Sequence, residues 1–222
     1  MSDRVYVVFY GGSDSWYGTS VSLASLSPVC HVGLVFDVTI PTTIKGITYP
    51  PGTYVYHAYD GVIIEPESTI QISYDRVYKM QIRHYRDKQM STLMELIDST
   101  YGTKYGLSQI LNPVRWEGGA TTDSGIMCVS LVQMYLNMLG YDYVMQTISP
   151  ALLKSLMEKR RHAKVISTTV RNGNAYQTRM VGLLLLIVSS IALLYAFWRL
   201  GKNIIMSHSR KPRLWQSQSY TL

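Results

Sequence analysis

The sequence has few residues that could form covalent or metal cross-links. Its 222 residues include two cysteines and five histidines. These are scattered along the chain without the spacing of zinc ligands, so we expect neither a disulfide framework nor a metal site. A Gly-rich loop ending in Lys-Ser or Lys-Thr, which would bind nucleotide phosphates, is also missing. The sequence therefore implies no cofactor.

Acidic residues are missing from the last part of the chain. Residues 1–158 carry ten Lys and Arg against fourteen Asp and Glu, whereas residues 159–222 carry eleven basic residues and no acidic one. The formal net charge of +7 thus comes from a basic tail and not from a basic domain. No recognised nucleic-acid fold or aromatic-interleaved basic surface accompanies the tail, so we expect no nucleic acid among the partners.

Charge is also missing from residues 180–198, which read MVGLLLLIVSSIALLYAFW between two arginines. As a helix this stretch would reach about 28 Å, close to the thickness of the hydrocarbon core of a bilayer. A buried core helix is the alternative, but such a helix rarely lacks a polar stripe over five turns. The sequence therefore predicts one transmembrane helix, with a lipid bilayer as a partner.

These features divide the chain into four parts. We expect a folded domain over 1–158, a basic linker over 159–179, the span over 180–198 and a basic tail over 199–222. No secretory signal precedes the domain. This order favours a tail-anchored protein whose domain lies in the cytosol, or faces outward from the inner membrane of a virion.

Within the domain, strand signals come early and helix signals come late. Short apolar or alternating runs bounded by Gly or Pro predict strands over 5–10, 31–38, 54–59, 61–65 and 78–84. Apolar residues at helical spacing predict three later helices. They lie around 90–97, over 128–139 with Asp123 or Ser124 as N-cap and Gly140 as C-cap, and from Ser149-Pro150 onward. The pattern indicates an α+β domain with an antiparallel sheet.

Three residues could form a nucleophilic site. Cys128 would lie in the first turn of a helix, where free backbone N–H groups and the helix dipole favour a thiolate. His31 could serve as its base, and His57 on the next strand could fix the tautomer of His31. The alternative is an inert core cysteine beside two structural histidines, because spacing alone does not separate the two cases. Strand alternation places Cys30 on the face opposite His31, so a disulfide with Cys128 is not expected.

The order of five sequence blocks resembles the circularly permuted branch of the NlpC-type papain-like fold. SLASLSPVCHVGLVF resembles the histidine strand of that family, and TYVYHAYDGVIIEPES the strand and turn that follow it. YGTKYG resembles a Tyr-centred block, GIMCVSLVQMYLNMLG the cysteine helix, and ISPALL the proline-initiated helix after it. The resemblance covers about residues 1–157 and implies a papain-like antiparallel sheet packed on helices.

The resemblance also implies a chemistry. It makes Cys128 the nucleophile, His31 the general base and acid, and His57 the residue that orients His31. A His-His-Cys set is the arrangement of the lecithin retinol acyltransferase-like branch, whose members form a thioester from an amide or ester. The implied activity is that of a membrane-anchored thiol hydrolase or acyltransferase with an acyl, peptide or lipid substrate. Cys128 is followed by Val129-Ser130, where the family commonly has Ser-Glu, and this leaves the substrate class open.

A catalytically inactive papain-like domain is the other class of function that fits the sequence. Such a domain would serve as a structural membrane-anchoring protein, for example between the inner membrane and the capsid of a virus. The eighteen tyrosines would suit contacts with protein partners. The intact Cys128, His31 and His57 favour the enzyme, because an inactive domain has no need of all three.

Overall fold

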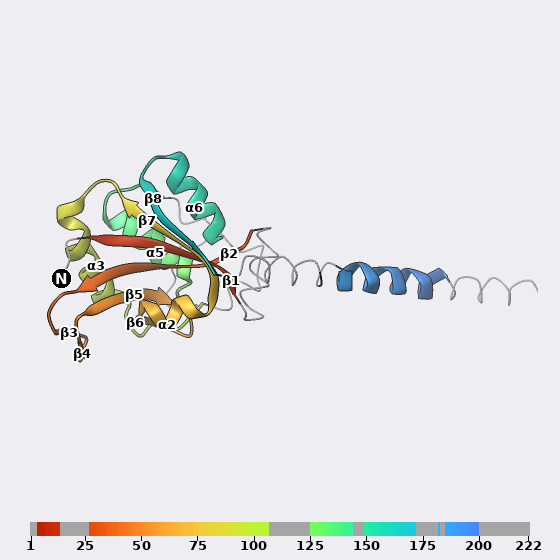
Figure 1. The fold of residues 1–222 in the computed structure, drawn as a ribbon, viewed down its shortest axis with the longest axis horizontal. Helices are drawn as coiled ribbons and strands as arrows, with labels where there is room; N and C mark the ends of the chain where they lie inside the picture. Colours follow the sequence, from red (N-terminus) through yellow and green to blue (C-terminus); the bar gives the residue numbers. More distant parts are fainter. Residues whose placement is uncertain are drawn as a thin grey trace, which may run out of the picture. The chain divides into compact units, whose positions relative to one another are not determined.

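A computed structural model describes residues 4–13, 27–106, 125–143, 149–171, 182 and 185–199. The chain divides into two compact units, Met1–Tyr176 and Gln177–Leu222. The first unit is an α+β domain with a six-stranded sheet, and all the paired strands of this sheet run antiparallel (Figure 1).

The sheet has the strand order β6-β5-β2-β1-β7-β8. Its strands are β1 (Val5–Ser13), β2 (Val29–Val38), β5 (Gly52–Ala58), β6 (Val62–Pro66), β7 (Tyr74–Ile82) and β8 (Ala163–Val170). A small separate hairpin, β3 (Thr42–Ile44) and β4 (Ile47–Tyr49), lies between β2 and β5 in the chain. The helices are α2 (Glu67–Ile72), the short 3-10 helix η1 (Arg86–Lys88), α3 (Gln89–Thr100), α5 (Cys128–Met138) and α6 (Pro150–Lys159).

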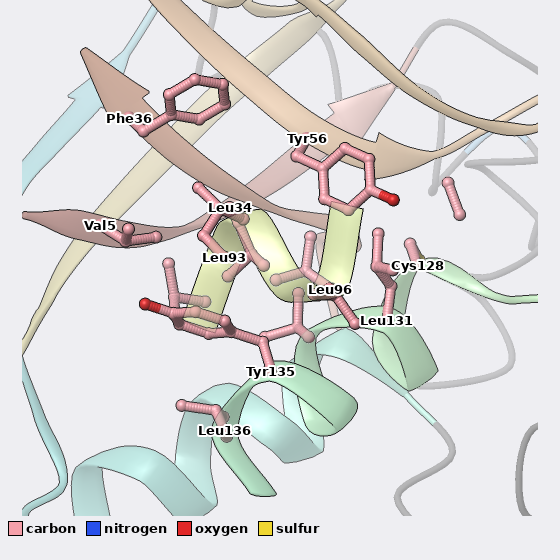
Figure 2. Close-up of a cluster of buried hydrophobic side chains, with 14 of the residues drawn as sticks. Val5, Leu34, Phe36, Tyr56, Leu93, Leu96, Cys128, Leu131, Tyr135 and Leu136 are labelled. Atoms are coloured by element: carbon pink, nitrogen blue, oxygen red, sulfur yellow. The ribbon is translucent and has the colours of Figure 1, made fainter. Parts of the chain in front are cut away.

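The main core lies between one face of the sheet and helices α3, α5 and α6. Alternate residues of the central strands point into it, as the two-residue period of a strand requires. They meet leucines of α3 and α5 and the large ring of Tyr135, and Cys128 lies in the same cluster (Figure 2). The sheet residues of this face include Val7, Phe9, Val32, Leu34 and Phe36.

A smaller core covers the other face of the sheet. It contains the remaining alternate residues of the central strands together with Cys30 and Tyr74, and Ile70 of α2 packs against it. The strand residues that face this side include Val8, Tyr10, Val35 and Val55. The sheet is therefore covered on both faces, which explains why its central strands read as nearly continuous apolar runs.

The helix that begins with Cys128 has no side-chain N-cap. Met127 occupies the cap position in an extended conformation and its side chain makes no capping hydrogen bond. The predicted caps Asp123 and Ser124 lie outside the described residues. At the other end of the helix Gly140 has a φ of +97°, the left-handed conformation that favours glycine after a helix.

The start of α6 agrees with the signal in the sequence. Pro150 is the first helical residue, and the hydroxyl of Ser149 accepts a hydrogen bond of 3.1 Å from the backbone N–H of Leu152. A serine cap followed by proline suits a helix start because proline has no N–H to leave unpaired.

The sheet continues past the end predicted for the domain. Part of the segment expected to be a basic linker, 159–179, forms β8, which pairs with β7 from Ile82–Ala163 to Arg76–Val170. β8 is an edge strand, and most of its residues are exposed or half-buried. A strand with an exposed face carries polar residues on that face. The sequence of β8 is therefore rich in polar residues and resembles that of a linker.

The predicted transmembrane helix is wrong. In the second unit residue 182 and residues 185–199 are helical. Within the described part of the chain no helix has the length and apolar character needed to cross a membrane. Residues 180, 181, 183 and 184 of the expected span lie outside that part. The predicted single-pass membrane location is contradicted by the same finding.

Candidate functional site

His31 and His57 lie where β2 and β5 separate. The pairing of the two strands runs from Val38–Gly52 to Leu34–Tyr56 and stops before either histidine. Gly33 stands between the end of this pairing and His31, and a Cβ on Gly33 would be only 3.1 Å from that of His57. The absence of a side chain at this position thus allows His57 to lie close to β2.

The two histidines and a glutamate form a continuous run of hydrogen bonds. Nε2 of His31 lies 2.8 Å from Nδ1 of His57, and Nε2 of His57 lies 3.1 Å from Oε2 of Glu65 on β6. The residues His31 and His57 are 3% and 0% exposed, whereas the Glu65 side chain is 35% exposed. The run therefore leads from the surface to a buried imidazole.

The charges of this run differ from one end to the other. Burial, and to a lesser extent the neighbouring His57, hold the pKa of His31 well below its usual value of 6.5. The hydrogen bond from His57 lowers the pKa of the Glu65 carboxyl, against the opposing effect of burial. At neutral pH His31 is therefore an uncharged imidazole and Glu65 a carboxylate.

Three tyrosines surround the histidine pair. The ring of Tyr74 stacks on His31 with centroids 5.9 Å apart and planes at 6°. Tyr10 lies 5.8 Å from His31, and Tyr59 lies 6.4 Å from His57 in a stacked arrangement. Burial raises the pKa of Tyr10 and of Tyr74, so both hydroxyls stay neutral. These rings hold the imidazoles in fixed orientations and keep water away from His31.

Cys128 is the first residue of α5 and is 4% exposed. Its sulfur accepts hydrogen bonds from the backbone of Val32 on β2, from the backbone of Val129 and from the side chain of Tyr105. These donors lower the pKa of the thiol, but burial is the larger effect and raises the pKa to about 11. In this state the thiol is protonated at neutral pH.

The structure brings the two predicted histidines together, but not the thiol and its expected base. Within the described ranges, no hydrogen bond joins Cys128 to His31 or His57. The Cys128 sulfur instead accepts a hydrogen bond from the backbone of Val32, the residue that follows His31. Tyr74 interacts with both His31 and Cys128. Its ring stacks on His31, and electrostatic interaction with Cys30 and Cys128 adds to the rise in its pKa.

The prediction that Cys30 faces away from His31 is wrong. Tyr10 of β1 pairs with His31, whereas Gly11 pairs with Val29, so β2 contains one extra residue at this point. Such a β-bulge interrupts the alternation of faces. Cys30 consequently lies in the smaller core beside Tyr10, where its sulfur contacts the Tyr10 carbonyl oxygen at 3.7 Å. Neither cysteine forms a disulfide.

The sequence patterns did not assign a role to two polar residues of this site. Tyr105 lies in the YGTKYG block, and Glu65 lies at the end of a predicted strand, but neither was given a role. His57 pairs with Ile63 across the β5–β6 hairpin, so Glu65 is its diagonal neighbour two residues further along. Diagonal neighbours on one face are within reach of long side chains, and this was the signal that could have identified Glu65.

The facing nitrogens of the histidine pair allow a proton to pass between the two rings. Groups of three or more His, Cys, Asp or Glu that could hold a metal ion do not occur among the residues with described positions. The nitrogens of the histidine pair face each other at hydrogen-bond distance.

No protein-family model matches the chain, and no curated protein matches its sequence. Among solved structures, the chain is similar to the metalloprotein yiiX from Escherichia coli O157:H7, described as DUF1105. The TM-score is 0.46 with 15% sequence identity, and the match covers 79% of this chain and 93% of the other.

Proposed function

We propose that the domain is a thiol-dependent hydrolase or acyltransferase of the permuted papain-like type, with Cys128 as its nucleophile. The observation that carries this proposal is the hydrogen-bonded run from Glu65 through His57 to His31, which ends one residue from the β2 backbone group bonded to the Cys128 sulfur. Nucleophilic catalysis by a thiol requires a base, and the run supplies a neutral imidazole on the strand whose backbone bonds the Cys128 sulfur.

The surroundings of the sulfur support a nucleophile over an inert core cysteine. A packed cysteine behaves as a small apolar residue and needs no donors around it. Cys128 has three, from Val32, Val129 and Tyr105. Donors directed at one point stabilise negative charge that develops there, because they need no reorganisation when the charge appears. They would stabilise the sulfur as it loses its proton.

In the proposed step, the Cys128 sulfur attacks the carbonyl carbon of an amide or ester and forms a C–S bond. The thiol proton passes to Nδ1 of His31, because Nε2 of His31 is bonded to His57. This transfer requires the imidazole to approach the sulfur, since no hydrogen bond joins the two groups in the structure. The C–N or C–O bond then breaks, and the leaving amine or alcohol takes the proton from His31. Water or another acceptor attacks the thioester and frees the thiol. Because the resting thiol is protonated, His31 acts as a general base and not as part of a standing ion pair.

A binding module with an inactive papain-like fold is the second candidate. It is favoured by the deep burial of Cys128 and by the raised pKa of its thiol. In that case the histidine run would be a structural element that satisfies buried polar groups.

Acylation by p-nitrophenyl acetate, followed by mass spectrometry of the full-length protein, tests the proposal. We expect one acetyl group on Cys128, with release of p-nitrophenol. Cys30→Ala is the matched control because Cys30, on β2, is the other buried cysteine that forms no disulfide, and this variant should be acetylated like the wild type. Cys128→Ala should not be acetylated, and His31→Ala should react at least about 100-fold more slowly.

The opposite results would support the binding module. They are equal acetylation of both cysteines, or a rate at Cys128 that does not change in His31→Ala. Either one would mean that Cys128 reacts only as an ordinary thiol.

A further inference from the structure

The hydrogen bonds around His57 limit where its proton can be. A neutral imidazole has one nitrogen that donates and one that accepts, and an ionised carboxylate only accepts. Glu65 Oε2 lies 3.1 Å from Nε2 of His57, so Nε2 must carry the proton. When His57 is a neutral imidazole, its Nδ1 is then the acceptor.

The same reasoning fixes the proton of His31. Nδ1 of His57 lies 2.8 Å from Nε2 of His31, so His31 Nε2 must donate. Nδ1 of His31 is left with its lone pair and makes no hydrogen bond to a described residue. Without the carboxylate, the reverse arrangement would satisfy the histidine pair equally well, with His57 donating to His31 and the proton of His31 on Nδ1.

We infer that Glu65 is a positioning residue that sets both histidines as Nε2–H tautomers and so leaves Nδ1 of His31 free to accept the proton of Cys128. The role of the tautomer in catalysis rests on the proposed function, whereas the tautomer assignment does not. In the reverse arrangement Nδ1 of His31 would already be protonated and could not act as a base.

Other groups near the pair do not compete for this role. Tyr10 of β1, Tyr74 of β7 and Tyr59 in the β5–β6 turn contact the imidazoles through their rings. Cys128 of α5 interacts electrostatically with Tyr74, and Glu67 of α2 with Tyr10. Among the hydrogen bonds of the described residues, Glu65 is the one acidic partner of either histidine.

Glu65 can be replaced without burying a new charge, although Glu65→Ala leaves the buried Nε2–H of His57 without its partner. The Glu65 side chain is 35% exposed, so a neutral residue there does not leave a fully buried charge unpaired. Glu65→Gln keeps the shape but can present either a carbonyl oxygen or an amide N–H to His57, and Glu65→Ala presents neither. Glu158→Gln is the matched control, because Glu158 is a surface carboxylate paired with Lys154.

The test is the ¹⁵N spectrum of the histidine side chains in the full-length protein at neutral pH, which separates Nε2–H from Nδ1–H tautomers. Signals of the pair are assigned by their loss in His31→Gln and His57→Gln. The wild type and Glu158→Gln should show Nε2–H for both residues. Glu65→Gln and Glu65→Ala should show mixed tautomers, with acetylation of Cys128 slowed about tenfold, as for other residues that orient a functional histidine.

Two results would overturn the inference: an Nδ1–H signal for His31 or His57 in the wild type, or unchanged Nε2–H signals in both Glu65 variants. The wild-type spectrum decides even if a variant fails to fold. If the tautomers are as expected but Cys128 is not acetylated, the proposed function fails while the assignment of Glu65 stands. If acetylation occurs with the opposite tautomers, only the role of Glu65 is refuted.

Discussion

Gly33 of β2 and His57 of β5 are in direct contact across the point where their strands separate. A Cβ on Gly33 would lie 2.6 Å from a methyl carbon of Val55 and 3.1 Å from the Cβ of His57. Real Cβ atoms do not approach a neighbour as closely as the first of these distances. The site therefore depends on a glycine that contributes no functional group.

The first prediction concerns Gly33→Ala. The added methyl group should push β5 away from β2, lower the free energy of unfolding by about 1–3 kcal/mol and weaken the His31–His57 hydrogen bond. Urea denaturation measures the first effect and the histidine ¹⁵N spectrum the second. Gly61→Ala is the control, because its Cβ would make only an ordinary contact of 3.4 Å with Thr103. Equal stability of the two variants would contradict the prediction.

Gly125 carries the second prediction. It lies three residues before Cys128, has a φ of +81°, and a Cβ there would be 2.4 Å from the carbonyl oxygen of Lys104. Gly125→Ala should lower the free energy of unfolding by about 2–4 kcal/mol, since steric conflict adds to left-handed strain. Gly102→Ala, with a φ of +79° and open space around it, should suffer only the strain of about 1 kcal/mol. The difference in urea midpoint between the two variants tests this.

The third prediction follows from the lowered pKa of His31. In the unfolded chain this imidazole takes up a proton below about pH 6.5, whereas in the folded domain it stays neutral to a lower pH. The unfolded state thus binds more protons in this window, so stability should fall as the pH falls, by up to about 1.4 kcal/mol per pH unit. His162, whose pKa is also lowered, acts in the same direction.

Comparison with His31→Gln isolates the contribution of this one residue. Urea unfolding of the wild type and the variant between pH 7 and pH 5 should give a shallower decline for the variant. Parallel declines would mean that His31 is protonated in the folded state as readily as in the unfolded state.

The fourth prediction concerns His57→Gln. A glutamine amide can keep one hydrogen bond to Nε2 of His31. It can either donate or accept this bond, so it no longer fixes the tautomer of His31 as the Glu65–His57 pair does. Acetylation of Cys128 should be slower than in the wild type but measurable, and faster than in His57→Ala. If His57→Gln reacted as fast as the wild type, His57 would have no part in orienting His31.

Local signals in the sequence predicted much of the domain. The Ser149-Pro150 pair identified the start of α6 to the residue. Strand alternation predicted a strand over 78–84, whereas β7 begins earlier, at Tyr74, and ends at Ile82. β8 could not be recognised in this way, because an exposed edge strand has no continuous apolar pattern. The apolar run near the C-terminus predicts a membrane span, but no helix in the described part of the chain is long and apolar enough to cross a membrane.

The site was less predictable than the fold. His31 and His57 could be paired from the sequence because they lie on neighbouring strands, whereas the part played by Glu65 depends on the register of the β5–β6 hairpin. Two of the donors to the Cys128 sulfur are backbone N–H groups. Every residue except proline has such a group, so the sequence does not identify them. Burial of the thiol, which raises its pKa, is likewise a property of the packed domain.

The extra residue in β2 determines which face of the sheet His31 occupies. Val29 and Val32 are an odd number of positions apart, yet both face the main core, because Cys30 shifts the phase of the strand between them. Apolar residues on either side of the shift can therefore anchor the strand to the helices while His31 is turned to the opposite face. The position of the imidazole is thus determined by the number of residues in β2, and deletion of a single residue there would move His31 or Val29 to the wrong side of the sheet.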